Sequence, residues 1–357
     1  MHCNLAADKY CMMKPALLVV ALLFSASCFA QSNSDLELKQ MQSIEYRIRP
    51  FADSMIFAQE WIDRFRADST FTRGLVQALK TPNSFYYNFD SIKTISKLYA
   101  PDSSFKLFTW QIMKDFSFYR QRGAIQMKTS DGSLKLFPLF DFSDFTTAPN
   151  DSVRDARHWI GAIYYKIVLK TFAGKNYYTL IGSDENDERS NKKWIDVLWF
   201  DDNNQPQFGG KFFSYPPNDP TKPKGPVYRF CIEYKKDGGV RLNYDARYDA
   251  IIFDHLTSET DEIQNKATLI PVGDFEAFKW INGKWVFNDN PFKNVIFGDN
   301  QSTFPAPLFD EKGKIDEKKL SDQSKKNQQK TSLPPIPNPN KINDKINQYK
   351  PGESSNN

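Results

Sequence analysis

The chain has 357 residues, of which 40% are hydrophobic and 15% aromatic, so it is long and apolar enough to fold around a sizeable core. Its 47 Lys and Arg residues are nearly balanced by 43 Asp and Glu residues. This mild basicity argues against a nucleic-acid-binding protein, which would concentrate positive charge on one surface.

Residues 1–30 have the layout of a secretory signal peptide. Lys14 precedes an apolar run from Ala16 to Phe24, and small residues then lead to Ala30. The apolar run is shorter than the roughly 20 residues that a membrane-spanning helix needs. We therefore expect cleavage after Ala30 and export of the mature chain to the periplasm or the cell exterior.

Cys28 offers a second interpretation of the same segment. It follows the small residues Ser-Ala-Ser and could be lipidated, which would make the protein a lipoprotein. Ser25, however, occupies the position where such signals usually carry a leucine. This departure favours cleavage after Ala30.

Residues 31–104 are expected to form helices that pack on a sheet. Apolar residues recur there at a spacing of three or four, which is typical of one face of a helix. They are Ile44, Ile48, Phe51, Met55, Ala58, Ile62 and Phe65. Pro50 is expected to start a new helix or to kink this one. A second helix is expected from Thr72 to Leu79, ended by Pro82.

Residues 105–310 are expected to form an antiparallel β domain, because short runs rich in aromatic and β-branched residues alternate there with Gly, Pro, Asn and Asp. Strands are predicted over residues 105–112, 122–128, 134–140, 158–172, 175–183, 193–201, 209–215, 227–235, 240–245, 250–256, 275–281 and 284–289. Tight hairpin turns are predicted at residues 173–175, 237–239 and 282–283. Short links join antiparallel neighbours. The fold class is therefore mainly β, a long meander that curls into a barrel or splits into a sandwich.

Several of these segments, among them "DSSFKLFTWQI", "WIGAIYYKIV", "KKWIDVLWFD" and "RYDAIIFDHL", resemble an uncharacterised family of exported proteins from Bacteroidetes-type bacteria. The resemblance covers about Phe71 to Asn288. It implies export and a β-rich fold, and it carries over no functional residues. The chain departs from the family at "SDENDERSNKK", where related members tend to have a glycine-containing turn.

Residues 311–357 are rich in Lys, Asn, Gln, Ser and Pro and contain almost no aromatic residues. Such a composition buries too little apolar surface to offset the entropy of an ordered chain. The sequence therefore predicts a disordered tail, with a short polyproline-like piece at residues 333–339.

Metal and cofactor sites have little support. Cys231 is the one cysteine left after the predicted cleavage, and a structural role is favoured over that of a nucleophile because no histidine is near it in the sequence. One cysteine and two histidines are too few for a structural zinc site. The oxygen-rich segments 184–191 and 201–205 lack the glycine and glutamate spacing of an EF-hand, so we expect polar turns. No metal and no cofactor is predicted.

Asp254 and His255 raise the question of catalysis. On a strand they would point to opposite faces, so neither could orient the other. His158 also lies at a predicted strand end, and the two histidines could meet at the mouth of a barrel. A general acid and base pair built from carboxylates is a further possibility, with Asp141, Asp196, Asp245 and Asp254 as candidates.

The aromatic content suggests one binding hypothesis. Trp110, Tyr164 and Trp199 could form an exposed platform that stacks on a sugar or a lipid-like ligand, although burial in the core is favoured for each. The function predicted from the sequence is thus an exported, non-catalytic binding or envelope-associated protein, whose partner is an unknown small molecule, glycan or envelope component. The alternatives are a carboxylate-based hydrolase at a β-barrel mouth and a lipocalin-like carrier of a small apolar ligand.

Overall fold

The computed structural model describes residues 35–219, 222–225, 227–289 and 291–292, together with 317–318, 321–322 and 324–325. The predicted signal peptide, including Cys28, and most of the predicted tail lie outside the described residues. The chain divides into two units after Pro291. In the second unit, residues 317–318, 321–322 and 324–325 are helical.

Two helices open the first unit, and their boundary differs from the prediction. Residues 35–57 form one helix that runs through Pro50, so the expectation that a new helix starts at this proline is wrong. The break falls at residues 58–60 instead. The next helix, α2 (Trp61–Leu79), begins well before the predicted Thr72.

Arg64 accounts for the position of this break. Its side chain is buried and donates hydrogen bonds of 2.7–2.9 Å to four main-chain carbonyl groups, those of Ala58, Gln59, Met113 and Lys114. The first two belong to the link between the helices and the last two to the end of a strand. One guanidinium group therefore satisfies carbonyls of both elements, a tertiary arrangement that local periodicity does not reveal.

The strands form three sheets. The first sheet contains β1 (Ser96–Tyr99), β2 (Phe105–Asp115), β3 (Phe118–Met127) and β4 (Lys135–Phe140) in this order. The second sheet contains β5 (Arg154–Asp155), β9 (Pro206–Phe208), β8 (Ser190–Phe200), β7 (Lys175–Asp184) and β6 (Ile163–Phe172), and β11 (Phe230–Lys235) also pairs with β8. The third sheet contains β10 (Phe213–Ser214), β15 (Lys284–Asn288), β14 (Leu269–Ile281), β13 (Ala250–Ser258) and β12 (Leu242–Asp245).

The mainly β fold class is confirmed. Every strand pairing in these sheets is antiparallel except that of β10 with β15. None of the three sheets, as described, closes on itself, because each strand order has two ends. The strands therefore split into stacked open sheets and do not form the barrel that the sequence left open.

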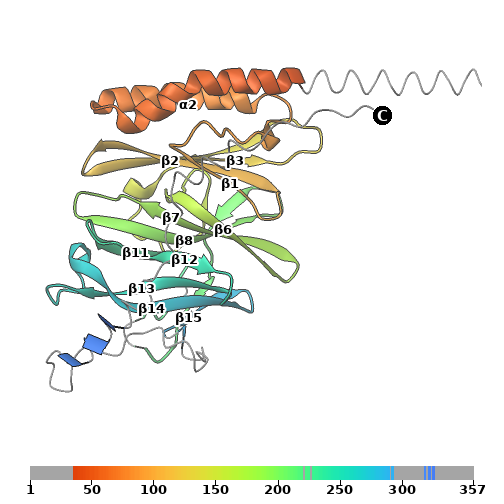
Figure 1. Ribbon diagram of the computed structural model, residues 1–357. Coiled ribbons are helices and arrows are strands. Elements are labelled where there is room, and N and C mark those ends of the chain that lie inside the picture. Colours follow the sequence, from red (N-terminus) through yellow and green to blue (C-terminus); the bar gives the residue numbers. More distant parts are fainter. Residues whose placement is uncertain are drawn as a thin grey trace, which may run out of the picture. The chain divides into compact units, whose positions relative to one another are not determined.

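The first unit is built in layers, with the helices above the first sheet and the second and third sheets below it (Figure 1). Three apolar cores fill the spaces between successive layers. On β8, Trp194 and Leu198 pack toward the first sheet, whereas Ile195 and Val197 pack toward the third. Burial on both faces explains why the segment "WIDVLWF" is an almost continuous apolar run.

Two of the three predicted hairpin turns are confirmed. Ala173 and Gly174 join β6 to β7, and Asn282 and Gly283 join β14 to β15; all four have φ between 49° and 79°. Such left-handed pairs fit the twist of two paired strands. The prediction at residues 237–239 is wrong, because this link joins β11 of the second sheet to β12 of the third. The tight turn therefore carries the chain from the second sheet to the third.

Three short helices of the 3-10 type complete the described elements. They are η1 (Ser84–Tyr86), η2 (Ser143–Phe145) and η3 (Lys266–Thr268). In the part of the chain that the structure describes, no helix combines the length and the apolar character needed to span a bilayer.

Candidate functional site

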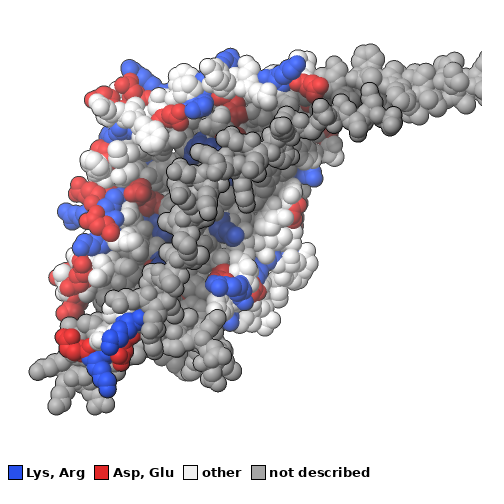
Figure 2. All heavy atoms as spheres, viewed as in Figure 1, with Lys and Arg blue, Asp and Glu red and all other residues white. Residues whose placement is uncertain are grey.

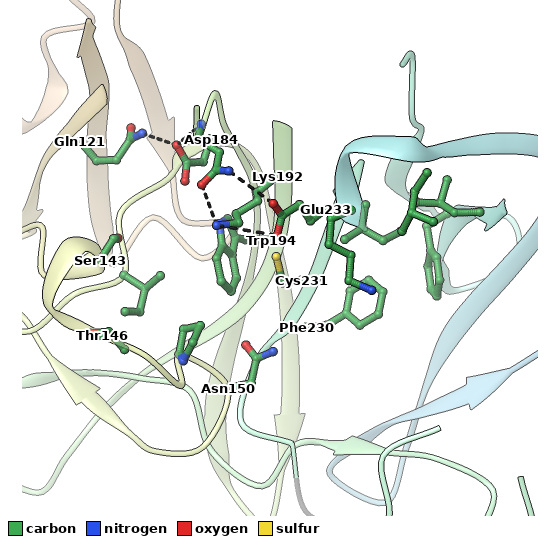
Figure 3. A pocket seen from close by; sticks show the side chains of 18 of the residues that line it. Gln121, Ser143, Thr146, Asn150, Asp184, Lys192, Trp194, Phe230, Cys231 and Glu233 are labelled. Atoms are coloured by element: carbon green, nitrogen blue, oxygen red, sulfur yellow. Dashed lines mark hydrogen bonds and ion pairs between the residues drawn. The ribbon is translucent and has the colours of Figure 1, made fainter. Parts of the chain in front are cut away.

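A cavity of about 720 Å³ lies beside β11 in the first unit (Figure 3). Its walls come from β3 of the first sheet, from the loop over residues 141–150, from the second sheet and from β13 and β14 of the third sheet. The volume falls in the range of roughly 300–1,000 Å³ that ligand pockets usually have. Segments distant in the sequence thus converge on one concave surface.

Gln121 of β3 and Asp184 at the end of β7 form the first part of a polar wall. The Gln121 Nε2 donates to Gln111 Oε1 at 2.7 Å and to Asp184 Oδ1 at 2.8 Å. The Asn186 main-chain N–H donates to the same Asp184 oxygen at 2.9 Å. Two elements therefore hold the amide and the carboxyl in fixed orientations.

Lys192 of β8 continues this wall toward β11. Its Nζ donates to Asn186 Oδ1 at 2.6 Å and lies 3.9 Å from Glu233 Oε2. Ser190 Oγ donates to the other Glu233 oxygen at 2.6 Å. Figure 3 shows Gln121, Asp184, Lys192 and Glu233 along one side of the cavity.

Three residues that line the cavity each have a buried side-chain atom with no hydrogen-bond partner within the described structure. These atoms are Gln121 Oε1, Asn150 Oδ1 and Trp194 Nε1. Gln121 and Trp194 are 2% and 5% exposed. A buried polar atom is destabilising unless it is hydrogen-bonded, and such atoms are uncommon in folded proteins. Their occurrence in residues that line one cavity marks it as a candidate ligand site.

The loop that carries Asn150 is anchored by Arg229, next to the start of β11. The Arg229 Nη1 donates to the carbonyl groups of Pro149 and Ser152, and its Nε donates to Asp196 Oδ2 at 3.1 Å. Both charged side chains are almost fully buried. A Cβ atom at Gly209 would lie 2.6 Å from Arg229 Nη2, so only glycine leaves room for the guanidinium group.

Asp141 fixes the other end of this loop. Its Oδ2 accepts the Gln121 main-chain N–H at 2.9 Å, and its Oδ1 accepts the Ser143 N–H and hydroxyl at 3.1 and 2.7 Å. Ser143 Oγ in turn accepts the Gly161 N–H at 3.0 Å. Asp141 and Asp184 are therefore both hydrogen-bonded to Gln121, one through its main chain and one through its side chain.

Asp184 has an unusual protonation equilibrium. Burial raises the pKa of its carboxyl from 3.8 to about 6; the Asn186 N–H and Lys192 oppose this, while the nearby Asp141 carboxylate adds to it. The ionised form is thus disfavoured in the folded chain. This penalty on stability is absent below pH 3.8 and complete above about pH 6.

We expect Asp184→Asn to stabilise the protein at pH 7. The asparagine oxygen can accept both hydrogen bonds made to Asp184 Oδ1, and the substitution removes a penalty of up to about 3 kcal/mol. Urea unfolding should show the gain above pH 6 and its loss by about pH 4.

Asp187→Asn in the same hairpin provides the control. Burial raises the pKa of Asp187 but is outweighed by hydrogen bonds from the Arg189 and Ser190 N–H groups, which lower it. This variant should be less stable than the native chain at pH 7. An equal effect of both substitutions would contradict the assignment of the penalty to Asp184.

The structure separates the two histidines predicted as catalytic. His255 lines the cavity, and its Nδ1 lies 3.1 Å from Glu276 Oε1. His158 does not line it; it lies on an exposed turn with its Nδ1 2.8 Å from Asp155 Oδ1. The two imidazoles therefore do not meet at a common site.

The expectation that Asp254 and His255 point apart stays a prediction, although both residues line the cavity. The register of β13 shifts between Asp254 and Leu256, and residues 253–256 all line the cavity. A bulge of this kind re-aims the side chains beside it. Asp254 nevertheless accepts the Arg241 main-chain N–H at 2.6 Å and is buried, so it supports the strand end.

Of the four carboxylates predicted as a catalytic pair, only Asp141 and Asp254 line the cavity. Asp196 is buried against Arg229. Asp245 is the last residue of β12, with Oδ2 2.7 Å from Nη2 of the exposed Arg247. The sequence predicts Asp184 only as part of a turn, because nothing in "DENDERSN" distinguishes a buried carboxylate from an exposed one.

The predicted aromatic platform is not formed. Trp110 is buried under the helices and its Nε1 donates to Asp68 Oδ1 at 2.8 Å. Tyr164 is buried between the first and second sheets, where its hydroxyl accepts the Trp159 Nε1–H at 3.0 Å. Trp199 donates to the Gly209 carbonyl and belongs to none of the three apolar cores. The three side chains therefore lie in three different parts of the fold and do not share one surface.

The remaining predictions concern Cys231 and metals. Cys231 is not disulfide-bonded, and desolvation raises the pKa of its thiol above the ordinary value, which lowers its reactivity. Residues 184–191 span the end of β7, the link to β8 and the start of β8, and residues 201–205 form the link from β8 to β9. Within the described ranges, no three His, Cys, Asp or Glu side chains are grouped to hold a metal ion.

Comparison with known proteins gives no relative: no family model, curated protein or solved structure matches the chain. The resemblance to exported proteins of Bacteroidetes-type bacteria stays a prediction from the sequence. The chemistry of the cavity is the starting point for a functional assignment.

Proposed function

We propose that the chain is an exported, non-catalytic binding protein and that the cavity beside β11 holds its ligand. The observation that carries this proposal is that three residues lining one cavity, Gln121, Asn150 and Trp194, each have a buried polar atom without a hydrogen-bond partner. A bound molecule that pairs with these atoms would stabilise the folded chain. The layout of residues 1–30 supports export.

The carboxylates of the cavity favour binding over catalysis. Both oxygens of Asp141 accept hydrogen bonds from the protein, and one Asp184 oxygen accepts two. These groups build and orient the wall. The polar character of the wall also favours a polar ligand over the apolar ligand of a lipocalin-like carrier.

A hydrolase is the second candidate, favoured by one observation. The pKa of Asp184 is raised to about 6, and the Asp141 charge contributes to this shift. A protonated carboxyl beside a second carboxylate is the arrangement that glycoside hydrolases use. Product analysis after incubation with any compound that binds would separate the two functions.

A thermal-shift screen of the full chain tests the binding proposal. The library should contain neutral, cationic and anionic small molecules. A ligand at one hundred times its dissociation constant stabilises the folded state by about 2.7 kcal/mol. We expect at least one compound to raise the melting temperature of the native chain and to lose most of this effect in Trp194→Phe, which removes only the indole N–H and part of the ring.

Trp61→Phe is the matched control, because Trp61 is 45% exposed and lies on α2. The response to the compound should be the same in this variant as in the native chain. If no compound stabilises the protein, or if each stabilises Trp194→Phe as strongly, the cavity is not the ligand site.

A further inference from the structure

We propose that the ligand is a neutral saccharide. This inference rests on the proposed binding function and adds the chemical class of the ligand. It follows from three properties of the cavity: the pattern of its unpartnered donors and acceptors, the sign of its charge, and the apolar side chains among its polar ones.

The unpartnered atoms require a ligand that both donates and accepts. Gln121 Oε1 and Asn150 Oδ1 are acceptors, whereas Trp194 Nε1 is a donor. Ammonium groups offer no acceptor to the indole, and an ionised carboxylate or phosphate offers no proton to the amides. A hydroxyl group does both. Figure 3 shows Asn150 across the cavity from Gln121, so hydroxyls at separate positions on one molecule are needed.

The charge of the lining disfavours anions. Six carboxylates line the cavity, those of Asp141, Asp144, Asp184, Glu233, Asp254 and Glu276, against three lysines. Lys222 already pairs with Glu276 at 2.8 Å, and Lys192 lies 3.9 Å from Glu233. The excess of three negative charges repels a phosphate or a uronate and accepts a neutral polyol.

Apolar side chains complete the fit. Trp194 and Phe230 line the same cavity, and Cys231, which follows Phe230 in the chain, is in cross-strand register with Trp194. Sugar rings present C–H groups as well as hydroxyls, so they suit a site that mixes aromatic carbon with polar atoms. The hydrogen bonds that hold Gln121 to Gln111 and Asp184 fix its amide before a ligand arrives, which lowers the entropy lost on binding.

A glycan array followed by calorimetry on the full chain tests this proposal. The array should present neutral oligosaccharides of glucose, galactose, mannose, xylose and N-acetylglucosamine beside uronate and sulfated glycans, and spermidine should be tested in solution. We expect binding to at least one neutral glycan. Its dissociation constant should rise about tenfold in Trp194→Phe, as for the loss of one hydrogen bond, and stay unchanged in Trp61→Phe.

Three results would overturn the proposal: binding of no neutral glycan, binding of uronate or sulfated glycans alone, or glycan binding that Trp194→Phe leaves intact. Should glycans fail while spermidine or a library compound binds with the Trp194 dependence, the binding function stands and only the saccharide class falls. Failure of every probe would remove both. Cleavage of a bound neutral glycan would support the saccharide class and replace the non-catalytic assignment by hydrolysis.

Discussion

Replacement of Arg229 by methionine is expected to destabilise the folded chain by about 3–5 kcal/mol, the usual loss when one partner of a buried ion pair is removed. Arg229 is fully buried and its Nε donates to Asp196, which is 2% exposed. Methionine leaves the Asp196 carboxylate in the core without its counter-charge. The carbonyl groups of Pro149, Ser152 and Phe208 lose a donor as well.

The same substitution should weaken ligand binding, because Arg229 fixes the loop that carries Asn150. Urea unfolding gives the change in stability, and Arg66→Met is the control, since Arg66 pairs with Asp63 on the exposed surface of α2. The double change Arg229→Met with Asp196→Leu should recover part of the loss by removing the unpaired carboxylate. A loss below about 1 kcal/mol in Arg229→Met would contradict the anchoring role.

The sequence predicts the strands well because their signals are local. Alternation and paired left-handed turns such as Asn282-Gly283 depend on a few neighbouring residues. The arrangement of strands into sheets depends on contacts between distant segments. β11 pairs with β8 across about forty residues, and the link at residues 237–239 reads like a hairpin although it joins two layers.

The candidate site is less visible in the sequence for the same reason. Gln121, Asn150 and Trp194 come from a strand, a loop and a strand of another sheet, and each is ordinary in its local context. Their common property, a buried atom without a partner, exists only in three dimensions. Histidines and aspartates attract attention in a sequence because of their chemistry, yet His158 lies outside the cavity and Asp196 is buried against Arg229.

Lys106 is the second residue for which we expect a large effect, on the pH dependence of stability. It is 1% exposed on β2; its Nζ donates to the Tyr87 carbonyl at 2.6 Å and lies 4.4 Å from the centre of the Tyr99 ring. Burial lowers the pKa of Lys106 from 10.5 to about 7, the Lys97 charge adds to this, and Asp90 opposes it.

The sign of the effect follows from proton binding. Below about pH 7 Lys106 is charged in the folded and the unfolded chain, so the folded state bears the whole penalty of burying the charge. Between about pH 7 and 10.5 the unfolded chain holds a proton that the folded chain lacks, and the free energy of unfolding rises with pH. The fall in pKa corresponds to about 5 kcal/mol over this interval.

Lys106→Met is expected to remove this rise. The variant should be more stable than the native chain below pH 7, because it buries no charge. Above pH 10.5 it should be less stable by about 1 kcal/mol, because methionine cannot donate to the Tyr87 carbonyl. Urea unfolding of both proteins across this range measures the difference. Groups that do not interact with Lys106 affect the two proteins alike, so the difference isolates Lys106 together with its coupling to Lys97 and Asp90. Lys128→Met is the control, because Lys128 is exposed. The stability of this variant should depend on pH in the same way as that of the native chain. If the free energy of unfolding changed with pH by the same amount in the native chain and in Lys106→Met, Lys106 would keep its ordinary pKa despite its burial.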